Sequence, residues 1–246
     1  MAAADQATSP SLRGSELLDL VDYRLAETEA DKEAIYRLRY DAYLREGTIQ
    51  PNPTLMISDR FDDMPNSWTF GVYFEGLLTS SIRISVGSAD HPETPSMDVF
   101  PDLLKPELAQ GRVFVDPTRF VADAARAKRF PELPYITVRL AYVACSYFNA
   151  DLGLATVRSE HQAFYRRVFL HEPLTGPRHY PGLIKPICLM AVDFPAMREK
   201  VFARYPFLRS TYFERRKLFE RSRPGTELQL DVPDLTFDRA SIVPRA

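Results

Sequence analysis

With 246 residues, the chain is long enough to form one large domain with a buried hydrophobic core. About 45% of its residues are hydrophobic and 26% are charged, which is ordinary for a soluble globular protein. The formal net charge of -2 excludes a general electrostatic attraction to nucleic acid, so a charged partner must be bound through a local patch.

The sequence predicts a cytoplasmic protein. Its start has an early acid and no apolar core of signal-peptide length, and no run approaches 18 apolar residues. Cys145 and Cys188 stand in apolar surroundings, as small core residues of a reducing compartment do. No metal site is predicted, because the histidines have no ligand spacing.

The first predicted elements are a strand over residues 21–28 and a helix over residues 29–46, which Gly47 ends. Arg39 and Tyr43 are four residues apart, so they are neighbours on the helix surface.

An acidic segment follows a proline-containing loop. In SDRFDDMPNSW, the carboxylates of Asp59, Asp62 and Asp63 crowd around one aromatic residue. Carboxylates this close repel one another unless they meet cations, a substrate amine or solvent. The segment is therefore either part of a site or a solvated turn.

A hairpin is predicted next, with strands over residues 68–77 and 78–86 and a turn near Glu75 and Gly76. Arg83 lies inside the second strand, on the face shared with Ser81 and Ser85. This arginine either points to water or belongs to a polar site.

The central segment runs from Gly111 to Asp123, GRVFVDPTRFVAD, and is predicted to be a buried strand. Pro117 cannot donate a hydrogen bond to a ladder, so we expect the strand to bulge or splay there. Asp116 and Arg119 flank this break. They are predicted to be reactive groups, with a structural ion pair as the alternative.

The remainder of the domain alternates helices and strands. A long helix is predicted from Pro134 to about Leu152 with Gly153 as its stop, then a strand over 154–159, a helix over 162–169 and a strand over 185–194. This order indicates an α/β or α+β domain of three layers with a mixed sheet.

Two basic regions are candidates for docking. Arg126, Lys128 and Arg129 follow the central strand and favour an anionic partner, although a solvated loop would explain them as well. Residues 196–223 are predicted to form two helices broken at Pro206, with basic and aromatic residues interleaved. Such helices either pack on the domain or dock to an acidic protein or a membrane surface.

We therefore expect three parts: a flexible lead over residues 1–18, the α/β domain over 19–195, and a helical extension with a tail over 196–246.

Several of these segments together resemble one branch of the GNAT acyltransferase fold. Their order and spacing are similar to those of acyl-homoserine lactone synthases and of the related long-chain N-acyl amino acid synthases. The resemblance covers roughly Tyr23 to Phe194, and it rests on Arg39 with Tyr43, Asp59 and Asp62, Arg83, the segment PSMDVFPDLL, and Asp116 with Arg119 and Phe120.

Three departures narrow the resemblance. The lactone synthases have a tryptophan near the position of Ile49 and a glutamate at the position of Asp116. The glycine-rich pyrophosphate loop of coenzyme A-using GNAT enzymes is replaced by AARAKRFPE. The missing tryptophan, together with the long C-terminal extension, favours an N-acyl amino acid synthase, and the missing loop favours a protein-tethered acyl donor.

The resemblance implies attack of an amino acid's amine on a thioester, which forms an amide and releases a thiol. It implies Asp116 as the base that takes the amine proton, and Arg83 or Arg119 as the group that binds the acceptor carboxylate. Asp59 and Asp62 would hold the ammonium or fix Arg39. Tyr165 would protonate the leaving thiolate, although a core position explains it as well.

The implied acyl donor is acyl carrier protein, whose acidic helix would dock on Arg126, Lys128 and Arg129; acyl-CoA is the alternative. No bound cofactor is implied. The acyl chain would lie between the helix over 135–148 and the hairpin over 70–74. Other functions that remain open are an acyl-homoserine lactone synthase, a GNAT N-acetyltransferase, and a non-catalytic acyl-binding module.

Overall fold

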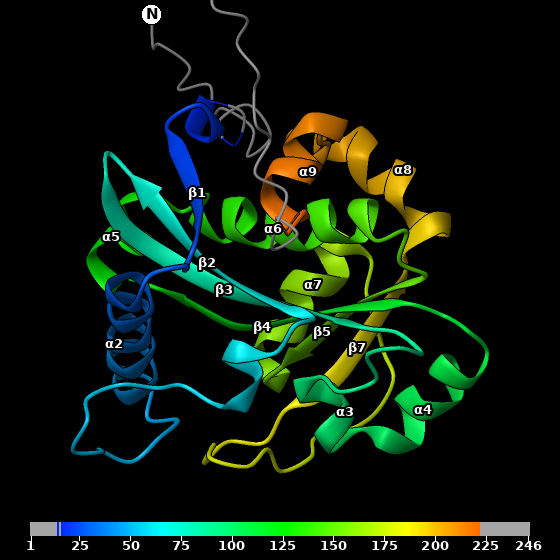
Figure 1. The fold of residues 1–246 in the computed structure, drawn as a ribbon, viewed down its shortest axis with the longest axis horizontal. Helices are drawn as coiled ribbons and strands as arrows, with labels where there is room; N and C mark the ends of the chain where they lie inside the picture. Colours follow the sequence, from blue (N-terminus) through cyan, green and yellow to red (C-terminus); the bar gives the residue numbers. More distant parts are fainter. Residues whose placement is uncertain (1–13, 15, 222–246) are drawn as a thin grey trace, which may run out of the picture.

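The computed structural model describes residue 14 and residues 16–221. Its centre is one seven-stranded sheet with the strand order β1-β2-β3-β4-β5-β7-β6 (Figure 1). Only the β4 and β5 pair is parallel in this sheet, so the mixed sheet and the α/β class are confirmed. The strands are β1 (Val21–Leu25), β2 (Ser67–Phe74), β3 (Leu77–Gly87), β4 (Phe114–Ala122), β5 (Leu152–Val157), β6 (Glu172–Pro173) and β7 (Cys188–Asp193).

The helices that cover the sheet agree in large part with the sequence pattern. They are α2 (Glu29–Arg45), α3 (Pro95–Val99), α4 (Pro101–Ala109), α5 (Ala124–Arg129), α6 (Leu133–Tyr147), α7 (Gln162–Phe169), α8 (Phe194–Arg204) and α9 (Tyr212–Phe219). Short 3-10 turns lie at η1 (Arg60–Asp63), η2 (Ser159–His161) and η3 (Pro206–Leu208). The predicted hairpin turn at Glu75 and Gly76 is confirmed, with positive φ at both residues.

The prediction that the long helix ends at Gly153 is wrong. Helix α6 ends at Tyr147, and Asn149 then adopts a left-handed conformation with φ 50°. Gly153 lies inside β5, paired with Val115 of β4. The apolar run therefore spans both the end of a helix and the start of a buried strand, which periodicity does not separate.

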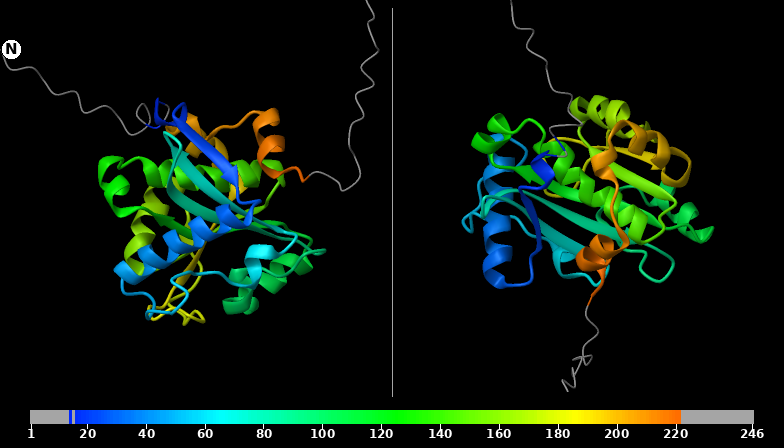
Figure 2. Two further views of the ribbon diagram at one scale, coloured as in Figure 1. Left: turned by 60° about the vertical axis from the view of Figure 1, so that its left-hand side comes forward. Right: turned by 90° about the horizontal axis from the view of Figure 1, so that it is seen from above.

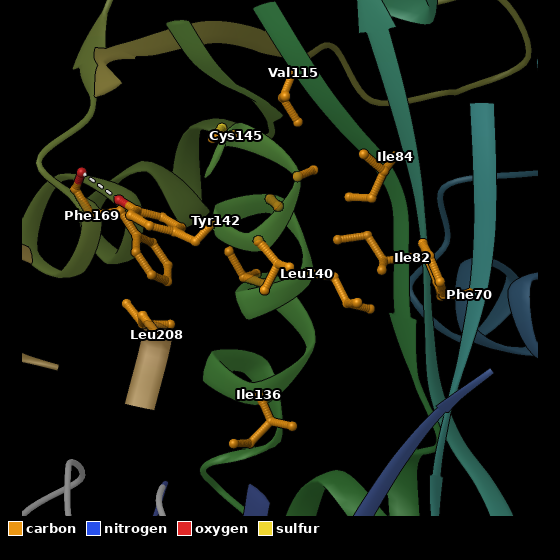
Figure 3. Packing of buried hydrophobic residues seen from close by; sticks show 14 of the residues in the cluster. Phe70, Ile82, Ile84, Val115, Ile136, Leu140, Tyr142, Cys145, Phe169 and Leu208 are labelled. Carbon is orange, nitrogen blue, oxygen red and sulfur yellow. Dashed lines mark hydrogen bonds between the residues drawn. The ribbon is translucent and has the colours of Figure 1, made fainter. Parts of the chain in front are cut away.

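The two faces of the sheet differ in polarity. On one face, Ile82 and Ile84 of β3 pack against Ile136 and Leu140 of α6 in the main hydrophobic core (Figure 3). The alternate residues of β3 point to the opposite face, where Ser81, Arg83 and Ser85 are all fully buried. We call this second face the polar face, and it lies toward α2, η1 and α3.

The C-terminal helices pack on the same core as the sheet. Phe202, Phe207 and Phe219 are buried in it, and the views in Figure 2 agree with Figure 1 in placing α9 beside α6. Arg139 of α6 is buried and donates to the carbonyl oxygens of Phe207 and Arg209. The expected break at Pro206 is confirmed.

Residues 1–13 and 15 of the lead predicted over 1–18 lie outside the described residues. Residues 222–246 of the predicted C-terminal tail lie outside them as well. Leu17 is buried against the main core. None of the helices in the described part of the chain combines the length and the apolar character that crossing a membrane would need.

Candidate functional site

The strands β4 and β5 separate at the centre of the sheet. They pair only through Phe114 with Leu152 and Val115 with Gly153, and they diverge from Asp116 onward. The expected splay at Asp116 and Pro117 is therefore confirmed. A cleft of about 350 Å³ opens there, lined by the end of α2, β4 from Pro117 onward, α5, β5 from Thr156 onward, α7 and the segment before β7.

The bulge in β4 lies two residues later than the proline. The pairing with β3 shifts between Ser81 and Arg83, so that Arg119 and Phe120 form the bulge. Arg119 has φ 55°, in the left-handed region, which a residue other than glycine adopts at an energetic cost. The bulge turns the guanidinium of Arg119 out of the strand repeat and toward Asp59.

Asp59 is the centre of an ion-pair cluster built from three elements. Its carboxylate accepts from Arg83 of β3 at 2.5 Å and from Arg119 of β4 at 2.6 Å. As the N-cap of η1, the same side chain also accepts from the backbone N–H of Phe61. The acidic segment is therefore not a solvated turn at Asp59, which holds two cations together.

A second buried pair supports this cluster. Arg39 of α2 donates to both oxygens of Asp62 at 2.9 Å, and both side chains are almost completely buried. Asp62 also accepts from Thr69 at 3.2 Å and lies 3.2 Å from Arg83. Asp63 lies apart, exposed and bonded to Lys32.

The pKa of Asp59, the acid of this ion-pair cluster, is strongly lowered. Burial alone would raise the pKa of Asp59, but the guanidinium groups of Arg83 and Arg119 outweigh it and hold that pKa well below its usual value. Burial would lower the pKa of Arg119, while Tyr43 and Asp59 raise it. Asp59 and Arg119 are thus both charged at neutral pH.

Of the two alternatives for Arg83, the one in which it points to water is wrong. Its side chain is fully buried, and it donates to Asp59 and to Thr118. Arg119 is 11% exposed and lines the cleft, with its guanidinium over the ring of Tyr43. Of the two arginines, Arg119 is the one that a molecule in the cleft can contact.

Asp116 lies deeper than the cleft and does not form an ion pair with Arg119. Its carboxylate is completely buried and accepts from the backbone N–H of Ser96 at 2.8 Å and from the Ser96 hydroxyl at 2.7 Å. Burial raises the pKa of Asp116, and the bonds from Ser96 oppose that shift only in part. The structural ion pair between Asp116 and Arg119 is therefore absent.

Tyr165 of α7 stands between the cleft and a second, almost closed cavity of about 10 Å³, and together with Pro117 it lines both. Burial raises the pKa of the Tyr165 hydroxyl, so it stays protonated at neutral pH. The second cavity is apolar, and α6 contributes Val138, Ala141, Tyr142 and Cys145 to its wall. The hairpin does not line it, contrary to expectation, because Phe70 and Phe74 pack on Phe219 and Phe130.

The basic residues that were expected in a loop lie on the short helix α5. Ala127 of this helix lines the cleft, and Lys128 and Arg129 beside it are exposed. The carboxylate of Asp123 caps the helix by accepting from the backbone N–H of Arg126. Because an acid already occupies this helix start, it is a poor site for the pyrophosphate of coenzyme A.

Four residues of the site escaped sequence reasoning. Thr118 bonds to Arg83, Ser96 bonds to Asp116, and Thr156 bonds to Ser96. Burial raises the pKa of Tyr180, before β7, to about 12, and the positive charges of Arg119 and Arg83 oppose this rise. Two of them had a signal in the sequence: Thr118 alternates with Asp116 along the strand, and Ser96 stands in the segment PSMDVFPDLL.

A sequence model of the family described as "N-acyl amino acid synthase FeeM" matches residues 34–193. The chain belongs to this family. It is therefore an acyltransferase, and its fold is GNAT-like. A comparison with curated proteins finds no match for the chain.

Solved structures share this fold. FeeM, an N-acyl amino acid synthase from uncultured soil microbes, has a TM-score of 0.62 at 16% identity, covering 74% of this chain and 96% of its own. The CoA-dependent acyl-homoserine lactone synthase MesI has 0.53 at 16% identity, covering 76% and 95%. BjaI, a CoA-dependent acyl-homoserine lactone synthase with SAM and isopentyl-CoA, has 0.51 at 15% identity, covering 76% and 89%.

Proposed function

We propose that this acyltransferase moves a fatty acyl group from a thioester on acyl carrier protein to the amine of an amino acid. The observation that carries the proposal is the cleft between β4 and β5. A guanidinium, Arg119, lies on its wall, and the apolar cavity begins where Pro117 and Tyr165 line both spaces. An amino acid and an acyl chain would thus meet at the point where the strands separate.

The acceptor is proposed to bind on the α2 side of the cleft. Its carboxylate is bound by Arg119, because a guanidinium binds a carboxylate in bidentate fashion and Arg119 is the exposed arginine of the cluster. Arg83 and the pair of Arg39 with Asp62 hold Asp59, and Asp59 in turn holds Arg119. Tyr43 forms the adjacent wall.

In the reaction, the neutral amine attacks the thioester carbonyl, the C–N bond forms and the C–S bond breaks. Asp116 takes the proton that the ammonium loses, for which a raised pKa suits it. Backbone N–H groups of β4 beyond its last pair with β5 would stabilise the oxyanion. Tyr165 gives its proton to the leaving thiolate.

The donor arm enters past α5. Arg126, Lys128 and Arg129 would contact the acidic helix of the carrier, and the acid-capped start of α5 argues against coenzyme A. The acyl chain would extend into the apolar cavity, whose 10 Å³ barely suits one water, so its walls must move to admit a chain. The reaction would take place in the cytoplasm, with the exposed Tyr212 and Phe213 of α9 touching a membrane surface.

The test is mass spectrometry of lipid extracts from cells that express the protein, with cells expressing Arg119→Ala as the control. We expect a new long-chain acyl amide whose two fragments identify the amino acid and the acyl chain. An acyl-homoserine lactone instead would assign the chain to the lactone synthase reaction, and an acetylated amine would assign it to N-acetyl transfer. Binding of acyl chains without a new product would leave a non-catalytic module.

A further inference from the structure

Asp116 has no direct access to the cleft. Its side chain is completely buried, and it is not among the residues that line the cleft. A base needs contact with the proton it takes, either directly or through an intervening hydroxyl or water. The proposed role of Asp116 thus requires a path for the proton.

Two hydroxyl groups form such a path. Ser96 of α3 lies across the gap between the diverging strands and donates to Oδ1 of Asp116 at 2.7 Å. The same Ser96 oxygen lies 2.5 Å from Oγ1 of Thr156 in β5. Thr156 is partly exposed and lines the cleft, whereas Ser96 is completely buried.

The carboxylate of Asp116 at the end of this path determines which hydroxyl donates and which accepts in each hydrogen bond. An ionised carboxylate only accepts, and a hydroxyl has one proton to donate. Ser96 gives its proton to Asp116, so it must accept from Thr156. Thr156 then has its remaining lone pairs for a donor in the cleft, as an ammonium group is.

We infer that Thr156 and Ser96 form a hydroxyl relay that carries the acceptor's ammonium proton from the cleft to Asp116. This inference rests on the proposed function. The ammonium gives a proton to Oγ1 of Thr156, which passes its own to Oγ of Ser96, which passes its own to Oδ1 of Asp116. The products are a neutral amine and a protonated Asp116, and both hydroxyls are restored.

The site favours transfer in this direction. Burial disfavours the charged form of Asp116, whereas Asp59 and Asp62 are paired with guanidinium groups. The backbone N–H of Ser96 also holds Oδ2 of Asp116, which fixes the carboxylate with Oδ1 toward the relay. The geometry therefore leaves Oδ1 as the oxygen that receives the proton.

The test compares Thr156→Val, which keeps the shape of the side chain but removes the hydroxyl, with Thr156→Ser, which retains it. With an amino acid acceptor at neutral pH, we expect Thr156→Val to lower kcat/KM by about 100-fold, within the usual range for acid–base catalysis. Thr156→Ser should stay near wild type. Ser67→Ala is the matched control, because Ser67 forms a similar buried pair with Ser85 on the polar face but is not in the path.

A second acceptor separates proton transfer from structural damage. Aminooxyacetate resembles an amino acid, but its amine is neutral at pH 7 and needs no proton removed before attack. Thr156→Val should use it about as well as the wild type does, and its loss with the amino acid should shrink as the pH rises. Equal losses with both acceptors, or no loss with either, would overturn the relay.

The variant Asp116→Asn distinguishes failure of the relay from failure of the proposed function. If Asp116→Asn is inactive while Thr156→Val is unaffected, Asp116 remains the base and the relay is wrong. If Asp116→Asn turns over at the wild-type rate, the base itself is misassigned and the relay fails with it. If the wild type forms no acyl amide at all, the proposed function is wrong.

Discussion

Asp59 and Asp116 lie on one polar face, yet their surroundings act on them in opposite directions. Guanidinium groups hold the pKa of Asp59 low, whereas burial raises the pKa of Asp116. When two acids in one site have pKa values that are pushed apart, the one with the raised value suits proton transfer and the other suits binding of a cation. This contrast supports Asp116 as the base and Asp59 as the holder of Arg119.

Asp116→Asn is the first prediction at the scale of single residues. Because the amide cannot take a proton, we expect acyl transfer to fall by about two to four orders of magnitude. In the wild type, activity should decline as the pH falls through the raised pKa of Asp116, since the base must be ionised. Steady-state rates from pH 4 to 9 measure both effects, and wild-type rates for the variant would remove the role.

The two arginines of the cluster are predicted to behave differently. Arg83→Ala removes a fully buried guanidinium and takes one of two arginine partners from each of Asp59 and Asp62, so it should lower the free energy of unfolding by about 3–5 kcal/mol. Arg119→Ala leaves Asp59 still paired with Arg83, so the fold should persist while the KM for the amino acid rises.

Chemical denaturation and acceptor titrations distinguish these outcomes for Arg83→Ala and Arg119→Ala. A stable Arg83→Ala protein would contradict the structural role that we assign to Arg83. An unfolded Arg119→Ala protein would show that Arg119 is itself needed for the fold. An unchanged KM for the amino acid in folded Arg119→Ala would show that this residue does not bind the acceptor.

At the scale of elements, the separation of β4 from β5 creates the site. The parallel pair ends after Val115, and each neighbouring element then contributes one function to the opening: α2 and η1 bring the charges, α3 brings Ser96, α7 brings Tyr165 and α5 brings the basic rim. Helix α5 is short and lies in the segment AARAKRFPE, which stands in place of the glycine-rich loop of coenzyme A-using GNAT enzymes. Changing the charge of α5 therefore tests whether the donor is acyl carrier protein or acyl-CoA.

Reversing Arg126, Lys128 and Arg129 to glutamate should raise the apparent KM for an acyl carrier protein donor and weaken its salt dependence. Transfer from a small acyl thioester should be nearly unchanged. A matched reversal of Arg24, Arg37 and Lys105 changes the net charge equally at exposed residues that do not line the cleft, and should leave this KM alone. Palmitoyl-CoA serving as well as the carrier-bound donor would contradict the docking assignment.

At the scale of the whole molecule, the C-terminal helices share the core with the sheet. Phe219 of α9 is 1% exposed and packs on Trp68, Phe70, Tyr147 and Phe148. Arg139 fixes the segment before α9 through the carbonyl oxygens of Phe207 and Arg209 and through Glu214. Stability of the domain should therefore depend on this segment.

Phe219→Ala should lower the free energy of unfolding by about 3–5 kcal/mol, the usual cost of removing a buried aromatic ring. Phe213 on the same helix is 77% exposed, and Phe213→Ala should change stability by less than about 0.5 kcal/mol. Urea denaturation of both variants measures the difference. Equal costs would mean that α9 does not share the core.

The sequence by itself determined most of the elements, the mixed α/β class, the splay at Asp116 and Pro117, and the residues that gather on the polar face. These follow from local signals: the alternation in β3, the glycine after α2, and the missing N–H of Pro117. The motif residues also carried the resemblance to the N-acyl amino acid synthases, which the family match now supports.

Only the tertiary structure decided the partners and the depth of each side chain. Asp59 and Arg119 are 60 residues apart, as are Ser96 and Thr156, and no local pattern connects them. Sequence alternation placed Arg83 on a polar face, but whether that face met water or protein depended on α2 and η1, which cover it. Burial is set by elements that come from elsewhere in the chain, so it decided which arginine faces the cleft and which only supports it.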